Sequence, residues 1–321
     1  MKKILLVKTS SMGDVVHNLP VVSDIRSRLP DAEIDWVVEE TLAALPRLHA
    51  AVRQVIPVAV RRWRKTLWRR ETRDEIRHFL RVLRASRYDA VIDTQGLLKS
   101  AMIARAAQGM RYGLDWSSAR EPLGLLYDRT FSVPWTLHAV ERNRLLAAQA
   151  LEYALPAKVD YNVHATAAKF SWLPAARYAV LLHATSAERK LWQEANWKDI
   201  GRYFMKQGLV CVLPWGSAAE RRRSESLASA IPGAVVPPVL QLNDAAALLA
   251  GARAVIGVDT GLSHLAAALG TPTVGIYCAT DPGATGIYGC PRAVNLGGTG
   301  RPPKVSEVLA ALGRLVPGLQ Q

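Results

Sequence analysis

The six residues Asp259–His264 are the part of this chain whose types and order most directly suggest chemistry. They follow the apolar run 254–258 and precede the helical pattern 265–269, so we expect a buried strand that leads straight into a helix. At such a junction, backbone N–H groups point out of the positive end of the helix dipole, where a diphosphate can bind. A capped turn without a ligand has the same local pattern. The stretch alone leaves both interpretations open, and His264 could equally contact a phosphate or be satisfied in the core.

A second candidate loop, Lys8–Asp14, follows the first expected strand. It contains a single glycine, and therefore matches neither the G-x-G-x-x-G dinucleotide fingerprint nor the G-x-x-x-x-G-K-[ST] phosphate loop. Asp14 is its only carboxylate. This side chain could cap the helix that follows, or it could accept a proton from a hydroxyl nucleophile.

A third loop, 183–192, follows the first expected strand of the second half. Its Thr185, Ser186 and Lys190 can donate hydrogen bonds to a phosphate and balance its charge, although a polar surface loop has the same composition. Glu220, after a neighbouring strand, could bind a ribose or sugar hydroxyl. Polar groups therefore gather at three strand ends.

Short apolar runs alternate with amphipathic stretches in both halves of the chain. This pattern predicts an α/β fold with two doubly wound parallel sheets, with ligands bound beyond the carboxyl ends of the strands and between the domains. The expected strands are 3–7, 34–38, 52–58, 90–92, 178–182, 209–213, 234–236, 254–258 and 273–277. The expected helices are 21–29, 68–85, 97–107, 197–206, 218–230, 243–250, 261–269 and 305–315. The expected parts are an N-terminal domain 1–160, a linker 161–177, a C-terminal domain 178–304 and a closing helix 305–321.

The composition is that of a large globular protein. A chain of 321 residues, half of them hydrophobic, can bury a substantial core. No apolar run approaches the roughly 18–20 residues that cross a bilayer. The apolar segment 4–7 ends at Lys8, which favours a buried strand over a signal peptide. Cys211, Cys278 and Cys290 have no C-x-x-C spacing, so they favour a reducing cytoplasm over disulfides or a thiolate zinc site.

The formal net charge of +14 implies a polyanionic partner, such as a nucleic acid, an anionic membrane surface or a phosphorylated substrate. The densest segment is 61–70, with six cations and two tryptophans. A solvated helix face would explain this segment. Tryptophans among cations also suit a membrane interface, with the rings at the acyl boundary and the cations at the phosphates. A nucleic-acid-binding protein would be basic too, but the chain has no recognised nucleic-acid-binding motif.

Several segments together resemble the ADP-heptose:lipopolysaccharide heptosyltransferases, over nearly the whole chain. The matching segments are Lys8–His17, Asp35–Glu40, Arg61–Lys65, Asp93–Ser100, His138–Arg142, Val258–His264 and Thr280–Gly283. The match is specific because unrelated loops agree at once. It implies a GT-B fold, in which two Rossmann-like domains face each other across a cleft. By the same resemblance, the N-terminal domain 1–160 would bind the acceptor and the C-terminal domain 178–304 the nucleotide sugar. It also implies an inverting transferase that moves L-glycero-D-manno-heptose from ADP-heptose to a Kdo residue of Kdo2-lipid A in the lipopolysaccharide inner core.

The resemblance also assigns roles to residues. Asp14 corresponds to the general base, and Lys190 is the second catalytic candidate. The donor-binding candidates are Thr185, Ser186, Lys190, Glu220, Leu240, Asp259, Thr260, Gly261 and His264. The acceptor-binding candidates are Ser10, Ser11, Gly13, Arg61, Arg62, Arg64, Lys65, Lys99 and Arg120. No D-x-D motif or His/carboxylate cluster indicates a metal, so we expect fixed positive groups to stabilise the diphosphate.

We expect such an enzyme in the cytoplasm, peripheral on the inner membrane, with a nucleotide sugar and an anionic lipid saccharide as partners and no nucleic acid. Two enzymatic alternatives remain. A sibling heptosyltransferase would add a later heptose, although Arg61–Lys65 and Ser10–Met12 favour the transferase of the first one. A nicotinamide-dependent oxidoreductase fits the fold class but lacks the glycine fingerprint.

Overall fold

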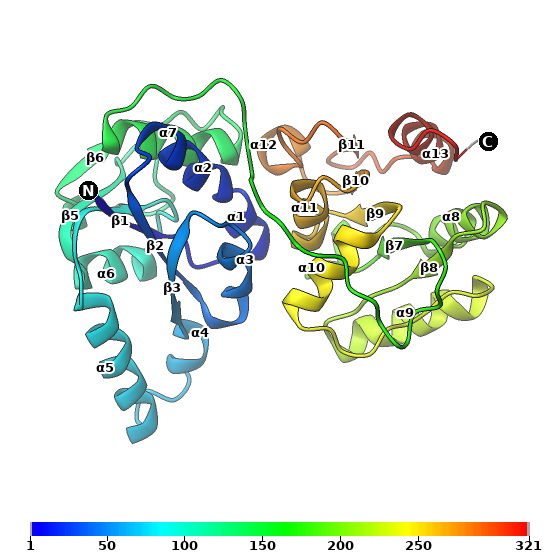
Figure 1. Ribbon diagram of the computed structural model, residues 1–321, viewed down its shortest axis with the longest axis horizontal. Helices are drawn as coiled ribbons and strands as arrows, with labels where there is room; N and C mark the ends of the chain where they lie inside the picture. The colour runs from blue at the N-terminus through cyan, green and yellow to red at the C-terminus, as the bar shows by residue number, and fades with distance from the viewer. Residues whose placement is uncertain (1, 320–321) are drawn as a thin grey trace. The chain divides into compact units, whose positions relative to one another are not determined.

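The computed structural model describes residues 2–319, which form two compact units that divide between Val163 and His164 (Figure 1). Each unit has its own sheet and its own core. No helix among the described residues is both long enough and apolar enough to cross a membrane.

The first unit is a six-stranded parallel sheet in the order β3-β2-β1-β4-β5-β6. Its elements are β1 (Lys3–Val7), α1 (Met12–Val16), α2 (Leu19–Arg28), β2 (Glu33–Glu39), α3 (Ala44–Arg47), β3 (Val52–Val58), α4 (Val60–Trp63), α5 (Arg70–Arg84), β4 (Arg87–Asp93), α6 (Leu98–Ala106), β5 (Gln108–Leu114), β6 (Arg129–Phe131) and α7 (Ala139–Leu151), with 3₁₀ turns at Glu40–Leu42 and Gly124–Leu126. This is the strand order of dinucleotide-binding folds. The order reverses between β1 and β4, which opens a crevice at the carboxyl ends of these two strands.

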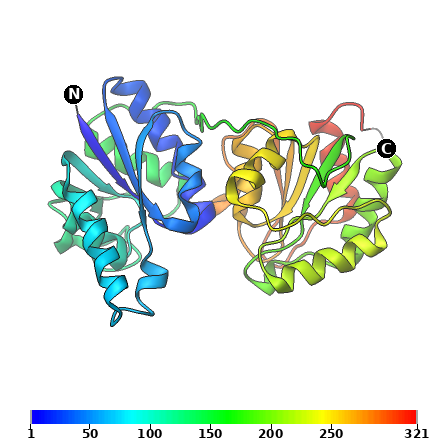
Figure 2. The same ribbon diagram turned by 60° about the horizontal axis from the view of Figure 1, so that its bottom comes forward.

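Helices cover both faces of this sheet, with α5 and α6 on one face and α2 and α7 on the other (Figures 1 and 2). Residues 4–7 of strand β1 are therefore buried and form a continuous apolar run, as expected for a parallel strand covered on both sides. Leu5 and Val7 share a core cluster with Phe79 and Leu83 of α5. Successive side chains of a strand point to opposite faces, so the residues between them face α2 and α7.

A buried ion pair joins α2 to α7. The Arg144 guanidinium donates to both carboxylate oxygens of Asp24, at 2.8 and 3.1 Å, and both side chains are almost completely buried. The same guanidinium donates to the carbonyls of Pro156 and Lys158. One side chain thus fixes two helices and the segment that follows α7.

The second unit is a five-stranded parallel sheet in the order β11-β10-β9-β7-β8. Its elements are β7 (Tyr178–Leu182), a 3₁₀ turn (Glu188–Lys190), α8 (Glu194–Lys206), β8 (Val210–Val212), α9 (Ala218–Ala230), α10 (Leu242–Gly251), β9 (Ala254–Val258), α11 (Gly261–Ala268), β10 (Thr273–Tyr277), α12 (Pro282–Thr285), β11 (Ala293–Gly297) and α13 (Val305–Leu315). Counted within the unit and from the β8 edge, this is the 2-1-3-4-5 order of flavodoxin-like sheets, whose switch point lies between β7 and β9.

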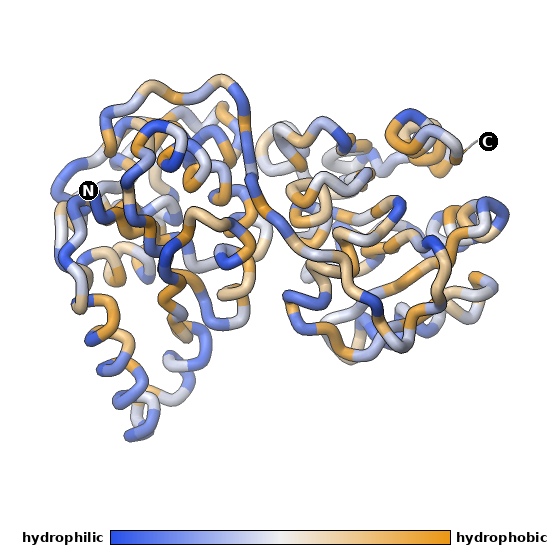
Figure 3. Tube along the Cα trace, viewed as in Figure 1, coloured by the Kyte–Doolittle hydropathy of each residue, from blue (hydrophilic) through white to orange (hydrophobic). Residues whose placement is uncertain are grey.

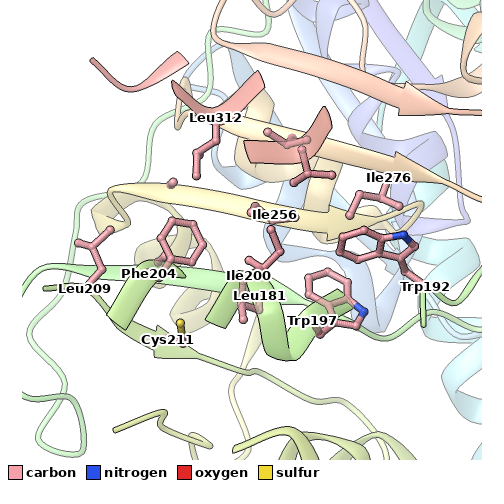
Figure 4. Packing of buried hydrophobic residues seen from close by; sticks show 14 of the residues in the cluster. Leu181, Trp192, Trp197, Ile200, Phe204, Leu209, Cys211, Ile256, Ile276 and Leu312 are labelled. Carbon is pink, nitrogen blue, oxygen red and sulfur yellow. The ribbon is translucent and has the colours of Figure 1, made fainter. Parts of the chain in front are cut away.

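The core on one face of this sheet is mainly aliphatic but includes three buried aromatic side chains (Figure 4). Trp192 and Trp197 pack edge to face, with ring centroids 5.3 Å apart, and both rings are buried. Phe204 of α8 and Leu312 of α13 belong to the same cluster. The edge-to-face arrangement is the one that aromatic quadrupoles favour.

The structure confirms the prediction of two doubly wound parallel sheets and corrects some of the expected elements. The strand expected at 234–236 is wrong, because Val235 forms only a single bridge to Val212. Two prolines follow at 237 and 238, and a proline has no N–H to continue a ladder. The sequence pattern also does not predict β5, β6, α7 and β11.

Candidate active site

Polar loops of the first unit meet at its topological switch point. The Lys8 ammonium, at the end of β1, donates to the carbonyl of Thr94 at 2.8 Å and to Oδ1 of Asn143 at 3.4 Å. The Gln95 side chain accepts from the backbone amides of Thr9 (2.7 Å) and Ser10 (3.0 Å). The loop after β4 therefore holds the loop after β1 in place.

Asp14 occupies the third position of helix α1, and Ser11 is the N-cap. Both the amide and the hydroxyl of Ser11 donate to Asp14 Oδ2, at 2.8 and 2.9 Å. The suggestion that Asp14 itself caps the helix is wrong in position, although its carboxylate does take part in the capping interaction. The half-buried carboxylate is therefore held in a defined orientation at the helix start.

The electrostatics of this loop keep Asp14 ionised. Burial favours the neutral carboxyl, but the Lys8 ammonium, the hydrogen bonds from Ser11 and the Arg120 guanidinium outweigh it and hold the pKa of Asp14 below its ordinary value. Burial also lowers the pKa of Lys8, against the attraction of Asp14 and Asp93. Asp14 is thus a carboxylate that can accept a proton near neutral pH.

Cations surround the pocket beside Asp14. Its lining is Lys8, Asp14, Thr94, Gln95, Leu114, Ser118, Arg120, Trp135, Ala139, Arg142, Asn143 and Leu146. The Arg142 guanidinium lies 3.6 Å from the ring centroid of Trp135 and donates to the Ser118 carbonyl at 2.6 Å. Burial lowers the pKa of Arg142. With Lys8 and Arg120, this arginine makes a pocket suited to a carboxylate ligand.

The structure brings several acceptor-binding candidates next to the Asp14 loop. Lys99 of α6 donates to Ser10 Oγ at 2.8 Å. Burial lowers the pKa of Lys99, and the nearby Arg61 and Arg64 guanidinium groups lower it further. The Glu39 carboxylate acts on the same ammonium in the opposite sense. Gly13 belongs to the same loop, in the first turn of α1.

Some of the other side chains in the basic segment 61–70 are paired or buried within the unit, and others are exposed. The Arg62 guanidinium pairs with Glu40 at 3.0 Å and with Glu75 at 2.8 Å, so this arginine ties α4 to two other parts of the unit. Trp63 is buried and donates to Glu75 at 2.7 Å, which is at odds with a place for its ring in a membrane interface. Lys65 and Trp68 remain exposed.

The second unit gathers donors around Asp259, at the end of β9. Lys190 Nζ and Thr280 Oγ1 each lie 2.7 Å from Asp259 Oδ2, and His264 Nε2 lies 3.6 Å from Oδ1. Thr185 Oγ1 donates to the Asp259 carbonyl at 3.0 Å. Burial favours the neutral acid, but His264, Lys190 and Thr280 outweigh it and hold the pKa of Asp259 far below its ordinary value.

Helix α11 begins directly at this cluster. Thr260 is its N-cap and Gly261 its first residue. The first-turn amides of an α-helix have no acceptor within the helix, so those of α11 are suited to an anion. The close packing needs Gly257, because a Cβ there would lie 2.1 Å from Ser263 Oγ, which donates to the Val258 carbonyl.

Three further donor-binding candidates lie in the segments that follow β7 and β8. Glu220 is in the first turn of α9, where its carboxylate accepts from the Gly216 amide at 2.7 Å. Ser186 is exposed in the loop after β7, and Leu240 is half-buried just before α10. The structure thus holds Glu220 through a backbone contact that the sequence did not reveal.

Comparisons with known proteins place the chain in a family. The model of glycosyltransferase family 9 (heptosyltransferase) matches residues 76–309. The chain is 49% identical over 290 residues to the lipopolysaccharide heptosyltransferase 1 of Pseudomonas aeruginosa, which covers 89% of this chain and 81% of that relative. This chain belongs to the glycosyltransferase family 9 heptosyltransferases. The family resemblance seen in the sequence is therefore confirmed.

Solved structures agree with this assignment. The heptosyltransferase is similar to E. coli heptosyltransferase WaaC with ADP, with a TM-score of 0.89, 41% identity, and coverage of 98% of this chain and 99% of the other. The same E. coli enzyme with ADP-2-deoxy-2-fluoro heptose matches with a TM-score of 0.83 and 41% identity, over 95% and 96% of the two chains. The expected GT-B-type fold of this heptosyltransferase is confirmed at the level of its two parallel α/β domains. Their arrangement across a cleft stays a prediction.

Sequence reasoning on this heptosyltransferase missed several residues that the fold places at the two clusters. Lys8, Gln95, Arg142 and Asn143 line the pocket beside Asp14, and Thr280 joins the Asp259 cluster. Their positions in the sequence could have identified them, because most of them follow a strand or lie in a segment that resembles the family.

Within residues 2–319, no three His, Cys, Asp or Glu side chains form a group that could hold a metal ion.

Proposed function

We propose that this heptosyltransferase moves L-glycero-D-manno-heptose from ADP-heptose to a Kdo residue of Kdo2-lipid A, with inversion, in the lipopolysaccharide inner core. The observation that carries the proposal is the ionised, oriented Asp14 carboxylate in a pocket of cations. The relative from P. aeruginosa carries the name of the first heptosyltransferase, and the matching E. coli structures contain ADP and an ADP-heptose analogue.

On the acceptor side, Asp14 takes the proton of the Kdo hydroxyl as that oxygen attacks the anomeric carbon of the heptose. The new carbon–oxygen bond forms on the face opposite the diphosphate, and the bond to ADP breaks with its electron pair on ADP. Lys8, Arg120 and Arg142 bind the Kdo carboxylate and orient the hydroxyl toward Asp14. Positioning of this kind converts binding energy into rate.

On the donor side, the diphosphate gains charge as it leaves. Lys190, the Thr185 and Ser186 hydroxyls and the first-turn amides of α11 stabilise that charge more in the transition state than in the ground state. Asp259 holds Lys190 at 2.7 Å, so the ammonium is preorganised before the donor binds. Such fixed positive groups perform the charge neutralisation that many nucleotide-sugar enzymes obtain from a metal.

The net charge of +14 suits an anionic lipid acceptor and a peripheral location at the cytoplasmic face of the inner membrane. Arg61, Arg64, Lys65 and Lys99 would contact the phosphates and Kdo carboxylates. Binding through exposed cations weakens with salt because the Debye length falls to about 8 Å at physiological ionic strength. Acceptor KM should therefore rise with salt more steeply than donor KM.

The test is ADP release from ADP-heptose with and without a Kdo-bearing acceptor, followed by mass analysis of the product. We expect release that depends on an acceptor that has no heptose yet. Turnover only with an already heptosylated acceptor would instead assign the chain to the sibling activity. No turnover with either acceptor would overturn the proposed function.

A further inference from the structure

Besides the polar pocket, the first unit has an apolar groove beside α4, α5 and α6. It has a volume of about 330 Å³. The lining residues are Val58, Val60, Trp63, Arg64, Leu67, Ile76, Phe79, Leu80, Lys99, Met102, Ile103 and Ala106. Along α5 and α6, orange apolar positions alternate with blue polar ones in Figure 3. The only charged side chains of this lining are two cations, Arg64 and Lys99.

The rim of the groove exposes large apolar side chains. Leu67 is 53% exposed and Met102 is 53% exposed, and the next residue after Leu67, Trp68, is 72% exposed. Exposed apolar residues that cluster around a groove mark an interaction surface, whereas scattered ones do not. Arg69 and Arg70 follow directly and are also exposed. The groove is therefore an apolar site with a cationic rim.

A second hollow, which shares Val58, Trp63 and Phe79 with the groove, differs from it in charge. Its volume is about 500 Å³. It is lined by Glu40, Glu71, Asp74 and Glu75 together with Arg62, His78 and apolar residues. An anionic amphiphile is repelled by this hollow and attracted to the first one. Charge thus selects the groove beside α6.

One residue, Lys99, connects the groove to the loop that carries Asp14. Lys99 lines the groove and donates to Ser10 Oγ at 2.8 Å. The Asp14 carboxylate acts on the same ammonium electrostatically. A lipid whose anionic sugar reaches Asp14 would therefore have its apolar part at the mouth of the groove.

We propose that this groove holds an acyl chain of the lipid acceptor while the saccharide of that acceptor lies at Asp14. The inference rests on the proposed function and adds a contact to the lipid part of the substrate. Burial of the methylene groups against Leu67, Ile76 and Met102 stabilises the complex through the hydrophobic effect. The cations Arg64 and Lys99 bind the anionic groups where the chain leaves the sugar.

Two substitutions at the rim test the groove, Leu67→Glu and Met102→Glu. Both side chains are already half-exposed, so the fold tolerates a carboxylate there. Activity is measured on acylated Kdo-lipid A in neutral detergent micelles and on the same saccharide after complete deacylation. For the acylated acceptor we expect KM to rise about tenfold, the change that follows from roughly 1.4 kcal/mol of lost binding. For the deacylated acceptor, kcat and KM should stay at the values of the unsubstituted protein.

Leu125→Glu is the matched control, because Leu125 is 96% exposed on the same unit and does not line the groove. It should leave both acceptors unaffected. The proposal is overturned if the rim variants affect both acceptors equally, if they affect neither, or if the control matches them.

A second experiment distinguishes an acyl chain of the acceptor from the bilayer as the ligand of the groove. It measures binding of the protein to anionic phospholipid vesicles that contain no acceptor. If Leu67→Glu and Met102→Glu abolish vesicle binding but keep full activity on the micellar acylated acceptor, the groove serves the bilayer and the proposal is wrong. Turnover of the deacylated acceptor by the unsubstituted protein tests the proposed function by itself, so the two failures remain distinguishable.

Discussion

Replacement of Asp14 by asparagine separates the two things that its carboxylate does in this structure. The carboxylate accepts two hydrogen bonds from Ser11, at 2.8 and 2.9 Å, and it is the proposed general base. Asparagine keeps an oxygen that can accept from Ser11, but an amide cannot take up the acceptor's proton. Asp14→Ala removes both functions.

The expected magnitudes differ accordingly. Loss of general-base catalysis lowers kcat by about 10²–10⁴-fold, which corresponds to roughly 2.7–5.4 kcal/mol of barrier. Loss of the capping interaction costs about 0.5–2 kcal/mol of stability. Asp14→Asn should therefore lose activity and lose less stability than Asp14→Ala, because it keeps an acceptor for Ser11 and gives up only the attraction to Lys8.

The assays are ADP release at saturating donor and acceptor, and urea denaturation of each variant. Donor affinity by calorimetry serves as the control, because the residues proposed to bind ADP-heptose belong to the other unit and should be unaffected. The assignment of Asp14 as the base is refuted if Asp14→Asn turns over within a few fold of the unsubstituted protein while it binds both substrates.

Three further predictions concern other charged groups. Lys190→Met should lower kcat about 10²–10³-fold, because it removes one preorganised cation from the leaving diphosphate; an unchanged rate of ADP release would contradict this role. Lys8→Met removes a cation that holds the pKa of Asp14 down, so that pKa rises and the acid limb of kcat/KM should move to higher pH; a limb that stays in place would exclude the link. Arg144→Met should cost about 3–5 kcal/mol of unfolding free energy near neutral pH, because Asp24 remains buried without its partner. Burial raises the pKa of Asp24, against the pull of Arg144, so the carboxyl becomes neutral as pH falls and the cost should shrink in mild acid; urea denaturation that shows the same cost at both pH values would disprove this.

Local sequence determined the two sheets and the position of the polar loops. The runs at β1 and β9 are continuous and apolar because both faces of a parallel sheet are covered. The turn from β9 into α11 could be recognised because its residue types fit a helix start next to a buried strand. These signals are local, because neighbouring residues determine both the backbone conformation that a segment prefers and its pattern of buried positions.

The missed elements show where local signals fail. β5 begins with four exposed or half-buried residues and contains glycines, and β6 has only three residues. Neither has the apolar run that identifies a buried strand. The buried face of helix α7 includes Arg144 and Asn143, whose polar groups bind distant partners, so this face is not a continuous apolar stripe in the sequence.

Only the tertiary structure decided which charged groups work together. Lys8 and Thr94 are 86 positions apart in the chain and meet because the strand order places β1 beside β4. Arg62 belongs to the same basic segment as Arg61, yet it is bound by two glutamates that its local sequence does not reveal. Electrostatic interactions depend on the distance between charges in space and not on their separation along the chain. The strand order of the sheet therefore decides which charged side chains become partners.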